Sequence, residues 1–291
     1  MKILKKIIYT MTISLIIFLL FSVIIPFVRF KRIKTPEFID HDKVKIIGHR
    51  GAAGLAPENT LASFSKALEI GVDIIELDIH LSSDDQLVVM HDSNVKRTTN
   101  GEGEIENLSV EDLKKLDAGS WYDKKYGSEK VPTLPEVFDL IDGRCKVIIE
   151  IKWPRKGTYD GIVEKLVTYL EQEELSQQVI IQSFETAYLK EISRIKPALE
   201  CHQLLFGDSS FFPVYYDTKI RFGNFEPLEN ISSVNTFYLY LDEKSKSMYE
   251  KKGIQTGVFT VNKKEDMLRA ASIGASYIIT DFPNIAKNIM R

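Results

Sequence analysis

The sequence is poor in cysteine, with only Cys145 and Cys201 among its 291 residues. The two are far apart, and neither belongs to a CxxC pair or lies near a histidine-rich set. The sequence therefore offers no zinc–thiolate site and no disulfide framework. The simplest interpretation is two thiols in the core, with a single disulfide as the alternative.

The sequence also has little net charge and lacks several widespread catalytic signatures. Its formal net charge is −3, and no repeat interleaves aromatic and basic residues, so it predicts no nucleic-acid partner. No G-x-S-x-G elbow is present, and no Walker or Rossmann glycine pattern follows an apolar run. These absences exclude serine hydrolases, P-loop enzymes and dinucleotide-binding enzymes. With 44% hydrophobic and 27% charged residues, the chain has the composition of one ordinary globular domain.

A long apolar run is present at the N-terminus, where no charged residue occurs from Ile7 to Val28. As a helix, this run is long enough to cross about 30 Å of hydrocarbon, and no A-x-A cleavage pattern follows it. We therefore predict a basic flank at residues 1–6, a transmembrane helix at 7–28 and a linker at 29–43. A cleaved signal peptide is the alternative.

The basic residues around this run leave its orientation in the membrane nearly balanced. Three lysines precede the run and four basic residues follow it: Lys2, Lys5 and Lys6 against Arg29, Lys31, Arg32 and Lys34. Because the run resembles a signal-anchor, we expect a single-pass protein of the cell membrane. Its C-terminal domain is then expected outside the cytoplasm.

Beyond the linker, short apolar runs rich in β-branched residues alternate with stretches of helical period. Eight such runs occur, at Val44–Ile47, Ile74–Ile79, Val147–Ile151, Val179–Gln182, His202–Phe206, Thr236–Leu241, Thr256–Val261 and Tyr277–Thr280. Strands that alternate with helices form a parallel sheet, and eight of them close a (β/α)8 barrel. The sequence therefore predicts an α/β fold of the TIM-barrel class over residues 44–291.

One further apolar run, Leu87–Asp92, does not fit this alternation. The second run extends past the barrel mouth to Leu81, and only residues 82–86 then separate it from Leu87. These are too few for a parallel crossover, so we predict an antiparallel hairpin. The stretch that comes next, to about Pro132, carries little sheet periodicity. We interpret residues 80–133 as an insertion packed over the barrel, with the hairpin returning His91 towards its mouth.

Three carboxylates are expected at one end of the barrel. Glu76 and Asp78 are two residues apart on the second run and point to the same side, and Glu150 lies at the end of the third. Active sites of TIM barrels form at the carboxyl ends of the strands. Hard oxygen ligands suit one divalent ion, Mg²⁺ or Ca²⁺, and no cysteine or histidine cluster offers zinc a better set.

Basic and polar residues are expected beside that ion. Arg50 and Lys152 are the cations typical of a phosphate site, and Gln182 ends the fourth run at the same mouth. His49 and His91 complete an acid/base pair, in which one takes the proton of an attacking oxygen while the other protonates a leaving alkoxide. The remaining three histidines are interpreted as structural. This inventory predicts a metal-dependent phosphodiesterase.

The chain contains, in order, HRGAAGLAPENT, IELDIHLSSDDQLVVMHD, EIK, SF, TVN and ITDFP. From about Lys45 to Asn284 it thereby resembles glycerophosphodiester phosphodiesterases. The resemblance implies a metal-dependent barrel that hydrolyses glycerophosphodiesters to an alcohol and glycerol 3-phosphate. It implies acid/base roles for His49 and His91, phosphate contacts for Arg50 and Lys152, and metal ligation by the three carboxylates.

Two stretches of the chain bear on the substrate. Where the family often has tryptophan before TVN, this chain has Phe259, which keeps an apolar ring for the substrate but has no indole N–H. The aromatic-rich residues 207–231 are either a packed loop or a surface that meets a membrane or a lipid substrate.

Three functions stay open on the sequence alone. The leading one is hydrolysis of soluble or polymeric glycerophosphodiesters by a membrane-tethered enzyme. The second is lysophospholipase D cleavage of membrane lysophospholipids at the same site, and the third is a non-catalytic binding barrel. The complete set of site residues speaks against the third, and no oligomeric state is predicted.

Overall fold

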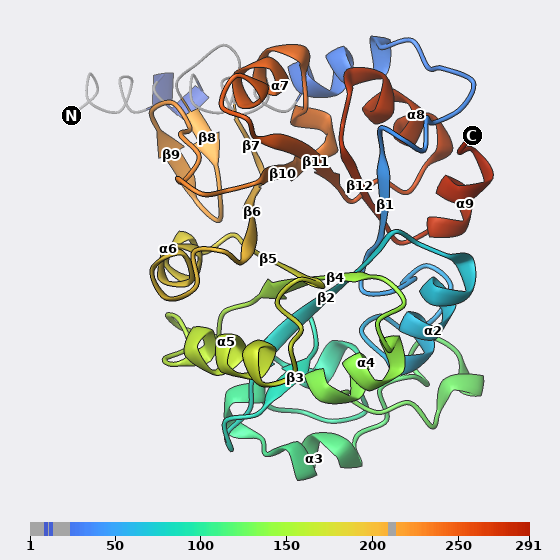
Figure 1. Ribbon diagram of the computed structural model, residues 1–291, viewed down its shortest axis with the longest axis vertical. Helices are drawn as coiled ribbons and strands as arrows, with labels where there is room; N and C mark the ends of the chain where they lie inside the picture. The colour runs from blue at the N-terminus through green and yellow to red at the C-terminus, as the bar shows by residue number, and fades with distance from the viewer. Residues whose placement is uncertain (1–8, 11, 14–23, 209–213) are drawn as a thin grey trace.

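The computed structural model describes residues 9–10, 12–13, 24–208 and 214–291, and its centre is a closed barrel of eight parallel strands (Figure 1). The barrel strands are β1 (Lys45–Gly48), β2 (Ile74–Leu81), β4 (Lys146–Ile151), β5 (Val179–Ser183), β6 (Glu200–Leu205), β10 (Ser233–Phe237), β11 (Gln255–Phe259) and β12 (Tyr277–Thr280). The barrel closes because β1 pairs in parallel with both β12 and β2. The predicted TIM-like barrel is confirmed.

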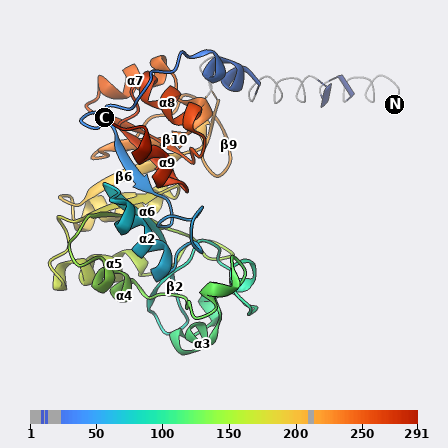
Figure 2. The same ribbon diagram turned by 90° about the vertical axis from the view of Figure 1, so that its right-hand side faces the viewer.

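Helices cover the outside of the barrel and connect its strands (Figures 1 and 2). They are α2 (Leu61–Ile70), α4 (Leu134–Ile141), α5 (Ile162–Gln172), α6 (Thr186–Ile195), α7 (Glu243–Glu250), α8 (Lys264–Ile273) and α9 (Pro283–Asn288). The ends of α2 show why a helix forms there. Thr60 accepts a hydrogen bond from the Ser63 amide at its start, and Gly71 ends it in the left-handed conformation with φ of 75°.

The sixth barrel strand begins earlier than the sequence predicts. The apolar run suggested Thr236–Leu241, whereas β10 starts at Ser233 and a short 3-10 helix, η4 (Tyr238–Tyr240), follows it. Polar residues hide the true start of the strand, because Asn235 points into the barrel and donates to Gln182 Oε1 at 3.2 Å. Buried polar groups with partners inside the barrel break the apolar pattern without breaking the strand.

The predicted hairpin is confirmed, since β3 (Leu87–Val89) pairs antiparallel with the end of β2. The insertion after it contains η1 (Val95–Arg97), η2 (Ile105–Asn107), α3 (Val110–Lys115) and η3 (Lys124–Tyr126), and has a small hydrophobic core of its own. It packs on the loop after β1, where the Tyr126 hydroxyl donates to the Leu55 carbonyl at 3.3 Å. The insertion therefore covers part of the carboxyl end of the barrel.

The predicted transmembrane helix, residues 7–28, falls mostly outside the described residues, which include only 9–10, 12–13 and 24–28 of it. Residues 24–32 are helical. Within the described parts of the chain, no helix is both long and apolar enough to cross a membrane. The stretch predicted as a linker, 29–43, contacts the barrel, because Phe30 and Ile39 are buried in a hydrophobic cluster with α8 and α9.

The aromatic-rich stretch after β6 forms a small antiparallel sheet beside the barrel. Its strands are β7 (Gly207–Asp208), β8 (Val214–Tyr216) and β9 (Ile220–Phe222). Neither cysteine is in a disulfide, and Cys201 is buried while Cys145 is half-buried, in agreement with the prediction of core thiols.

Candidate active site

Three carboxylates meet inside the carboxyl end of the barrel. Glu76 and Asp78 lie on β2, and strand register places Asp78 directly beside Glu150 on β4. One oxygen from each carboxylate lies within 4.8 Å of the others, and all three side chains are buried. The predicted cluster is therefore formed by two adjacent strands of the barrel.

Burial and mutual repulsion act strongly on this cluster. The pKa of Glu76 is raised well above its usual range, first by burial and then by the charges of Asp78 and Glu150. Burial also acts to raise the pKa of Asp78, but the positive charges of Lys152 and the neighbouring histidines and arginine outweigh it and lower that pKa. The basic groups of the described residues therefore stabilise the charge of Asp78 but do not relieve the repulsion at Glu76.

The cluster fits a divalent cation. Asp78 Oδ1 is buried and accepts no hydrogen bond from the described part of the chain, and Lys152 Nζ is 3.6 Å from it. A buried carboxylate oxygen without a donor is costly unless another group binds it. Three clustered oxygen donors without sulfur match the preference of Mg²⁺ or Ca²⁺, so Glu76, Asp78 and Glu150 could hold such an ion.

Arg50 is placed by an unusual turn of the backbone after β1. It adopts φ of 50°, and Gly51 follows with φ of 87°. A side chain on Gly51 would place its Cβ 2.5 Å from Ser63 Oγ, so only glycine allows this close turn onto α2. The Arg50 amide donates to Glu76 Oε2 at 2.8 Å, and its guanidinium donates to Glu58 Oε1 at 2.6 Å. Its Nε also lies 3.5 Å from Asp78 Oδ2, so both its backbone and its charge are directed at the cluster.

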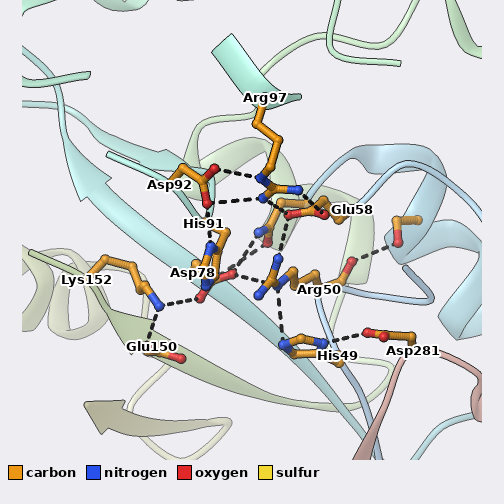
Figure 3. Close-up of polar contacts among 12 residues, drawn as sticks. His49, Arg50, Glu58, Asp78, His91, Asp92, Arg97, Glu150, Lys152 and Asp281 are labelled. Atoms are coloured by element: carbon orange, nitrogen blue, oxygen red, sulfur yellow. Dashed lines mark hydrogen bonds and ion pairs between the residues drawn. The ribbon is translucent and has the colours of Figure 1, made fainter. Parts of the chain in front are cut away.

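His49 is held between the carboxylate of Asp281 and the guanidinium of Arg50 (Figure 3). Its Nδ1 lies 2.6 Å from Asp281 Oδ1, and its Nε2 accepts from Arg50 Nε at 3.2 Å. Because Nε2 accepts, the proton of the neutral ring is on Nδ1, where it donates to Asp281. The pKa of Asp281 is lowered even though burial opposes this, because hydrogen bonds from His49 and Asn262 favour the carboxylate.

His91 repeats this arrangement from the opposite side of the site, after the β2–β3 hairpin. Its Nδ1 lies 2.6 Å from Asp92 Oδ1, and Arg97 Nε donates to the other carboxylate oxygen at 2.6 Å. The hydrogen bond with His91, and then Arg97, lower the pKa of Asp92. The backbone of His91 is fixed as well, because its carbonyl lies 3.1 Å from Nε2 of the buried His80.

Two further predicted residues complete the polar side of the site. Lys152 Nζ donates to Glu150 Oε1 at 2.7 Å, and its pKa is raised by these carboxylates although burial opposes this. Gln182 Nε2 donates to Glu76 Oε1 at 3.4 Å. Both side chains therefore sit against the carboxylate cluster.

A cavity of about 640 Å³ opens over these groups. Every predicted site residue except Asp78 lines it. Its other wall is aromatic and consists of Trp153, Phe184, Phe206, Phe237 and Phe259. Phe259 packs edge-on against Phe184 and Phe206, with ring centres 5.8 and 6.1 Å apart. One wall of the cavity is thus charged and the other is apolar.

The sequence profile of the glycerophosphoryl diester phosphodiesterase family matches residues 49–285, which span this whole site. The chain belongs to this family. It is 38% identical over 252 residues to the glycerophosphodiester phosphodiesterase of Caldanaerobacter subterraneus subsp. tengcongensis, covering 86% of this chain and 98% of that relative. It is 32% identical over 269 residues to the Bacillus subtilis glycerophosphodiester phosphodiesterase, covering 88% and 89% of the two chains.

Solved structures agree with the family assignment. An Oleispira antarctica phosphodiesterase, solved in complex with the product sn-glycerol-3-phosphate, aligns with a TM-score of 0.71 and 27% identity over 84% of this chain and 96% of that one. A glycerophosphodiester phosphodiesterase from Agrobacterium tumefaciens aligns with a TM-score of 0.69 and 26% identity, over 84% and 100%. The chain is a phosphoric diester hydrolase of the glycerophosphodiester phosphodiesterase type.

The roles of several residues in this phosphodiesterase site were not predicted from the sequence, although Asp281 was expected at the carboxyl end of the barrel. Asp281 and Asp92 orient the two histidines, and Asn59 donates to Asp78 Oδ2 at 2.8 Å. Glu58 accepts from Arg50 and also from Arg97. A signal existed for the two aspartates, because Asp281 follows the last barrel strand and Asp92 directly follows a predicted catalytic histidine. No comparable signal distinguished Glu58 or Asn59.

Proposed function

We propose that this chain is a divalent-metal-dependent glycerophosphodiester phosphodiesterase in which His49 and His91 move the protons of the reaction. The observation that carries the proposal is the buried cluster of three carboxylates, with Asp78 Oδ1 left without a hydrogen-bond donor in the described chain. Mg²⁺ or Ca²⁺ held by this cluster would offset its charge and polarise a phosphoryl oxygen.

The basic residues of the site would bind and orient the phosphate. Arg50 and Lys152 both face the cavity, and both already pair with carboxylates that hold their positions. Charge-assisted hydrogen bonds from these two groups to the non-bridging oxygens would fix the phosphorus between the histidines. Gln182 adds a neutral donor and acceptor beside Glu76.

The two histidines would act in opposite protonation states. One neutral imidazole takes the proton of the attacking oxygen as its bond to phosphorus forms. The other, as imidazolium, protonates the alkoxide that leaves as its bond to phosphorus breaks. Each ring is bound through Nδ1 to a carboxylate, so Nε2 is the atom that exchanges the proton. Exchange with water restores both rings after each turnover.

We propose glycerol 3-phosphate as the phosphate-bearing product. The Oleispira antarctica structure supports this, because that related phosphodiesterase was solved with sn-glycerol-3-phosphate as its product. We also propose that residues 7–28 hold the chain at the cell membrane as a single-pass anchor, with the barrel outside the cytoplasm. The uninterrupted apolar composition of that run supports this part.

The test is a product assay with three substrates side by side: glycerophosphocholine, glycerophosphoglycerol and lysophosphatidylcholine. We expect glycerol 3-phosphate from at least one of the first two, with release of choline or glycerol. Cleavage of lysophosphatidylcholine alone would reassign the enzyme as a lysophospholipase D. Release from none of the three would contradict the proposed substrate class.

A further inference from the structure

Two exposed apolar patches lie at the carboxyl end of the barrel, where the active site opens. The first, called here the helix patch, consists of Ile24, Phe27 and Val28, whose exposed fractions are 50%, 47% and 38%. The second, called the β9 patch, consists of Ile220 and Phe222, which are 51% and 86% exposed. Figure 2 shows the helix at residues 24–32 and β9 on the upper part of the barrel.

Contacts of the residues that follow it fix the position of the helix patch. Arg29 pairs with Asp242, the residue that caps the start of α7, at 2.6 Å. The Phe30 ring packs edge-on against Tyr238, the residue directly after β10, with 5.2 Å between ring centres. Lys31 pairs with Asp266 in the first turn of α8.

All three of these partner residues follow the carboxyl ends of barrel strands. Asp242 and Tyr238 come after β10, and Asp266 comes after β11. In a (β/α)8 barrel these loops surround the active site. The chain on the N-terminal side of Arg29, which includes the helix patch, therefore leaves the barrel at its catalytic end.

The β9 patch belongs to the same end, because the β7–β9 sheet directly follows the carboxyl end of β6. Ile220 and Phe222 are two residues apart on one strand, so they share a face. In the described sheet, β9 is an edge strand. Isolated exposed apolar residues are ordinary, but an exposed phenylalanine and isoleucine on one face of an edge strand mark a surface that binds another apolar surface.

Aromatic rings connect the cavity with the β7–β9 sheet. Phe206 is 48% exposed, lines the cavity and immediately precedes β7. Its ring stacks on Phe184 with 5.9 Å between centres and lies 6.1 Å from Phe237. Further along, Tyr216 on β8 packs on Tyr240 with 6.1 Å between centres. The apolar wall of the cavity therefore continues outward to the side of the mouth that carries β9.

Basic residues stand beside both patches. Lys219 directly precedes β9, Arg221 lies between the two patch residues but points to the other face of the strand, and Arg32 and Lys34 follow the helix patch. Asp217 offsets part of this charge, because it accepts from Arg221 Nε at 3.0 Å. Apolar side chains with adjacent lysine and arginine are the combination that binds the surface of an anionic bilayer.

The geometry points to a lipid bilayer as the surface that the catalytic end of this enzyme faces. We infer that the β9 patch docks on the same anionic bilayer into which the helix patch, the end of the proposed anchor, inserts, so that the mouth of the 640 Å³ cavity opens towards the head groups. We choose a bilayer over a protein partner because the helix patch is the end of the charge-free run that begins at Ile7, which is the proposed membrane anchor. This inference depends on the membrane attachment proposed above.

The experiment places a tryptophan at each end of the barrel in the full-length chain. Phe222→Trp reports on the β9 patch. Phe38→Trp is the matched control, because Phe38 is also an exposed phenylalanine, 41% exposed, but it precedes the Ile39–Met290 bridge near the start of β1 at the opposite end. Each variant is reconstituted in phosphatidylcholine–phosphatidylglycerol vesicles, with or without brominated acyl chains. The unsubstituted chain supplies the background from its two tryptophans.

We expect the brominated lipids to remove most of the emission added by Phe222→Trp and little of that added by Phe38→Trp. Unchanged emission from Phe222→Trp, or equal quenching of both variants, would overturn the inference. A third result would instead assign the patch to contacts between copies of the chain. In that case brominated lipids do not quench the Phe222→Trp emission, but its maximum shifts to shorter wavelength as the protein-to-lipid ratio rises. Turnover of water-soluble glycerophosphocholine by the same preparations tests the proposed function separately, since neither phenylalanine lies in the site.

Discussion

His49 Nδ1 lies 2.6 Å from Asp281 Oδ1, although 232 residues separate the two in the chain. The pairing exists because the barrel closes β1 against β12, which places the residues after both strands side by side. It fixes the imidazole with its proton on Nδ1, so the lone pair of Nε2, which Arg50 Nε contacts in this structure, faces the site as the proton acceptor. Asp281 is itself held by Asn262, whose Nδ2 donates at 2.6 Å.

Asp281→Asn should lower kcat by on the order of 10²-fold or more with little change in KM, because an amide N–H directed at His49 favours the wrong tautomer. Steady-state kinetics on glycerophosphocholine measure this. Asp217→Asn, which removes the charge of a half-buried carboxylate paired with Arg221 outside the cavity lining, is the control and should keep full activity. Equal activity in Asp281→Asn and the parent chain would show that this carboxylate does not set the state of His49.

His49→Ala and His91→Ala should each lower kcat by about 10²–10⁴-fold, the usual contribution of one general acid or base. The fold should persist, because both side chains face the cavity and not the hydrophobic core. His41→Ala serves as the control, since His41 is half-exposed and pairs only with Asp73 among the described residues. Circular dichroism confirms folding, and near-normal turnover by either site variant would remove that histidine from the mechanism.

Chelation by EDTA should abolish turnover and lower the Tm, and Mg²⁺ or Ca²⁺ should restore both. The physical reason is the repulsion within the buried cluster, which raises the pKa of Glu76 when no cation offsets it. Glu76→Gln removes one of these charges. In chelator its Tm should therefore exceed that of the parent chain, and added metal should change it little. If neither Mg²⁺ nor Ca²⁺ changes the Tm of the parent chain, the assignment of Glu76, Asp78 and Glu150 as metal ligands is contradicted, whatever the activity.

The free energy of unfolding should fall as the pH drops from about 6.5 to about 4, partly through His80. Burial lowers the pKa of His80 from 6.5 to about 4, so in this interval the unfolded chain binds a proton that the folded chain does not. The contribution of His80 to the free energy of unfolding is fully present above pH 6.5, is lost as the pH falls towards 4, and amounts to roughly 3 kcal/mol at most.

Urea unfolding curves recorded at pH 7 and pH 4.5, in the same detergent and with EDTA present, measure this loss of unfolding free energy. His80→Gln can keep the polar contacts with Tyr159 and the His91 carbonyl but cannot take up the proton. The variant should therefore lose less stability on acidification than the parent chain. The buried His202, whose pKa is also lowered by burial, is present in both proteins and cancels in the comparison. An identical loss in the two proteins would place the titration elsewhere.

The sequence predicted the barrel and the centre of the site because both produce patterns that are visible within a few consecutive residues. Polar residues such as Glu76 and Asp78 interrupt strands that are otherwise apolar, and the two-residue period of a strand places them on one side. The short link before β3 excluded a parallel connection in the same direct way. These inferences needed only spacing and residue type.

The hydrogen-bond partners of those residues could not be recognised from any short stretch of the sequence. Asp281 reaches His49 only because β12 and β1 are neighbours, and Gln182 meets Asn235 only across the barrel interior. The packing of Phe30 on the barrel was also hidden, because a basic stretch after an apolar run has the composition of a linker. Such contacts depend on closure of the sheet and on docking, which no window of the sequence contains.

Glu58 joins two parts of the chain that could otherwise vary independently. It accepts from Arg50 of the β1–α2 loop at 2.6 Å and from Arg97 of the insertion at 2.6 Å, and Arg97 in turn holds Asp92. An insertion transplanted from another relative would therefore bring His91 into register only if it carried a matching arginine. The insertion of this enzyme is not an interchangeable module: chimeras would have to exchange it together with the loop that contains Glu58.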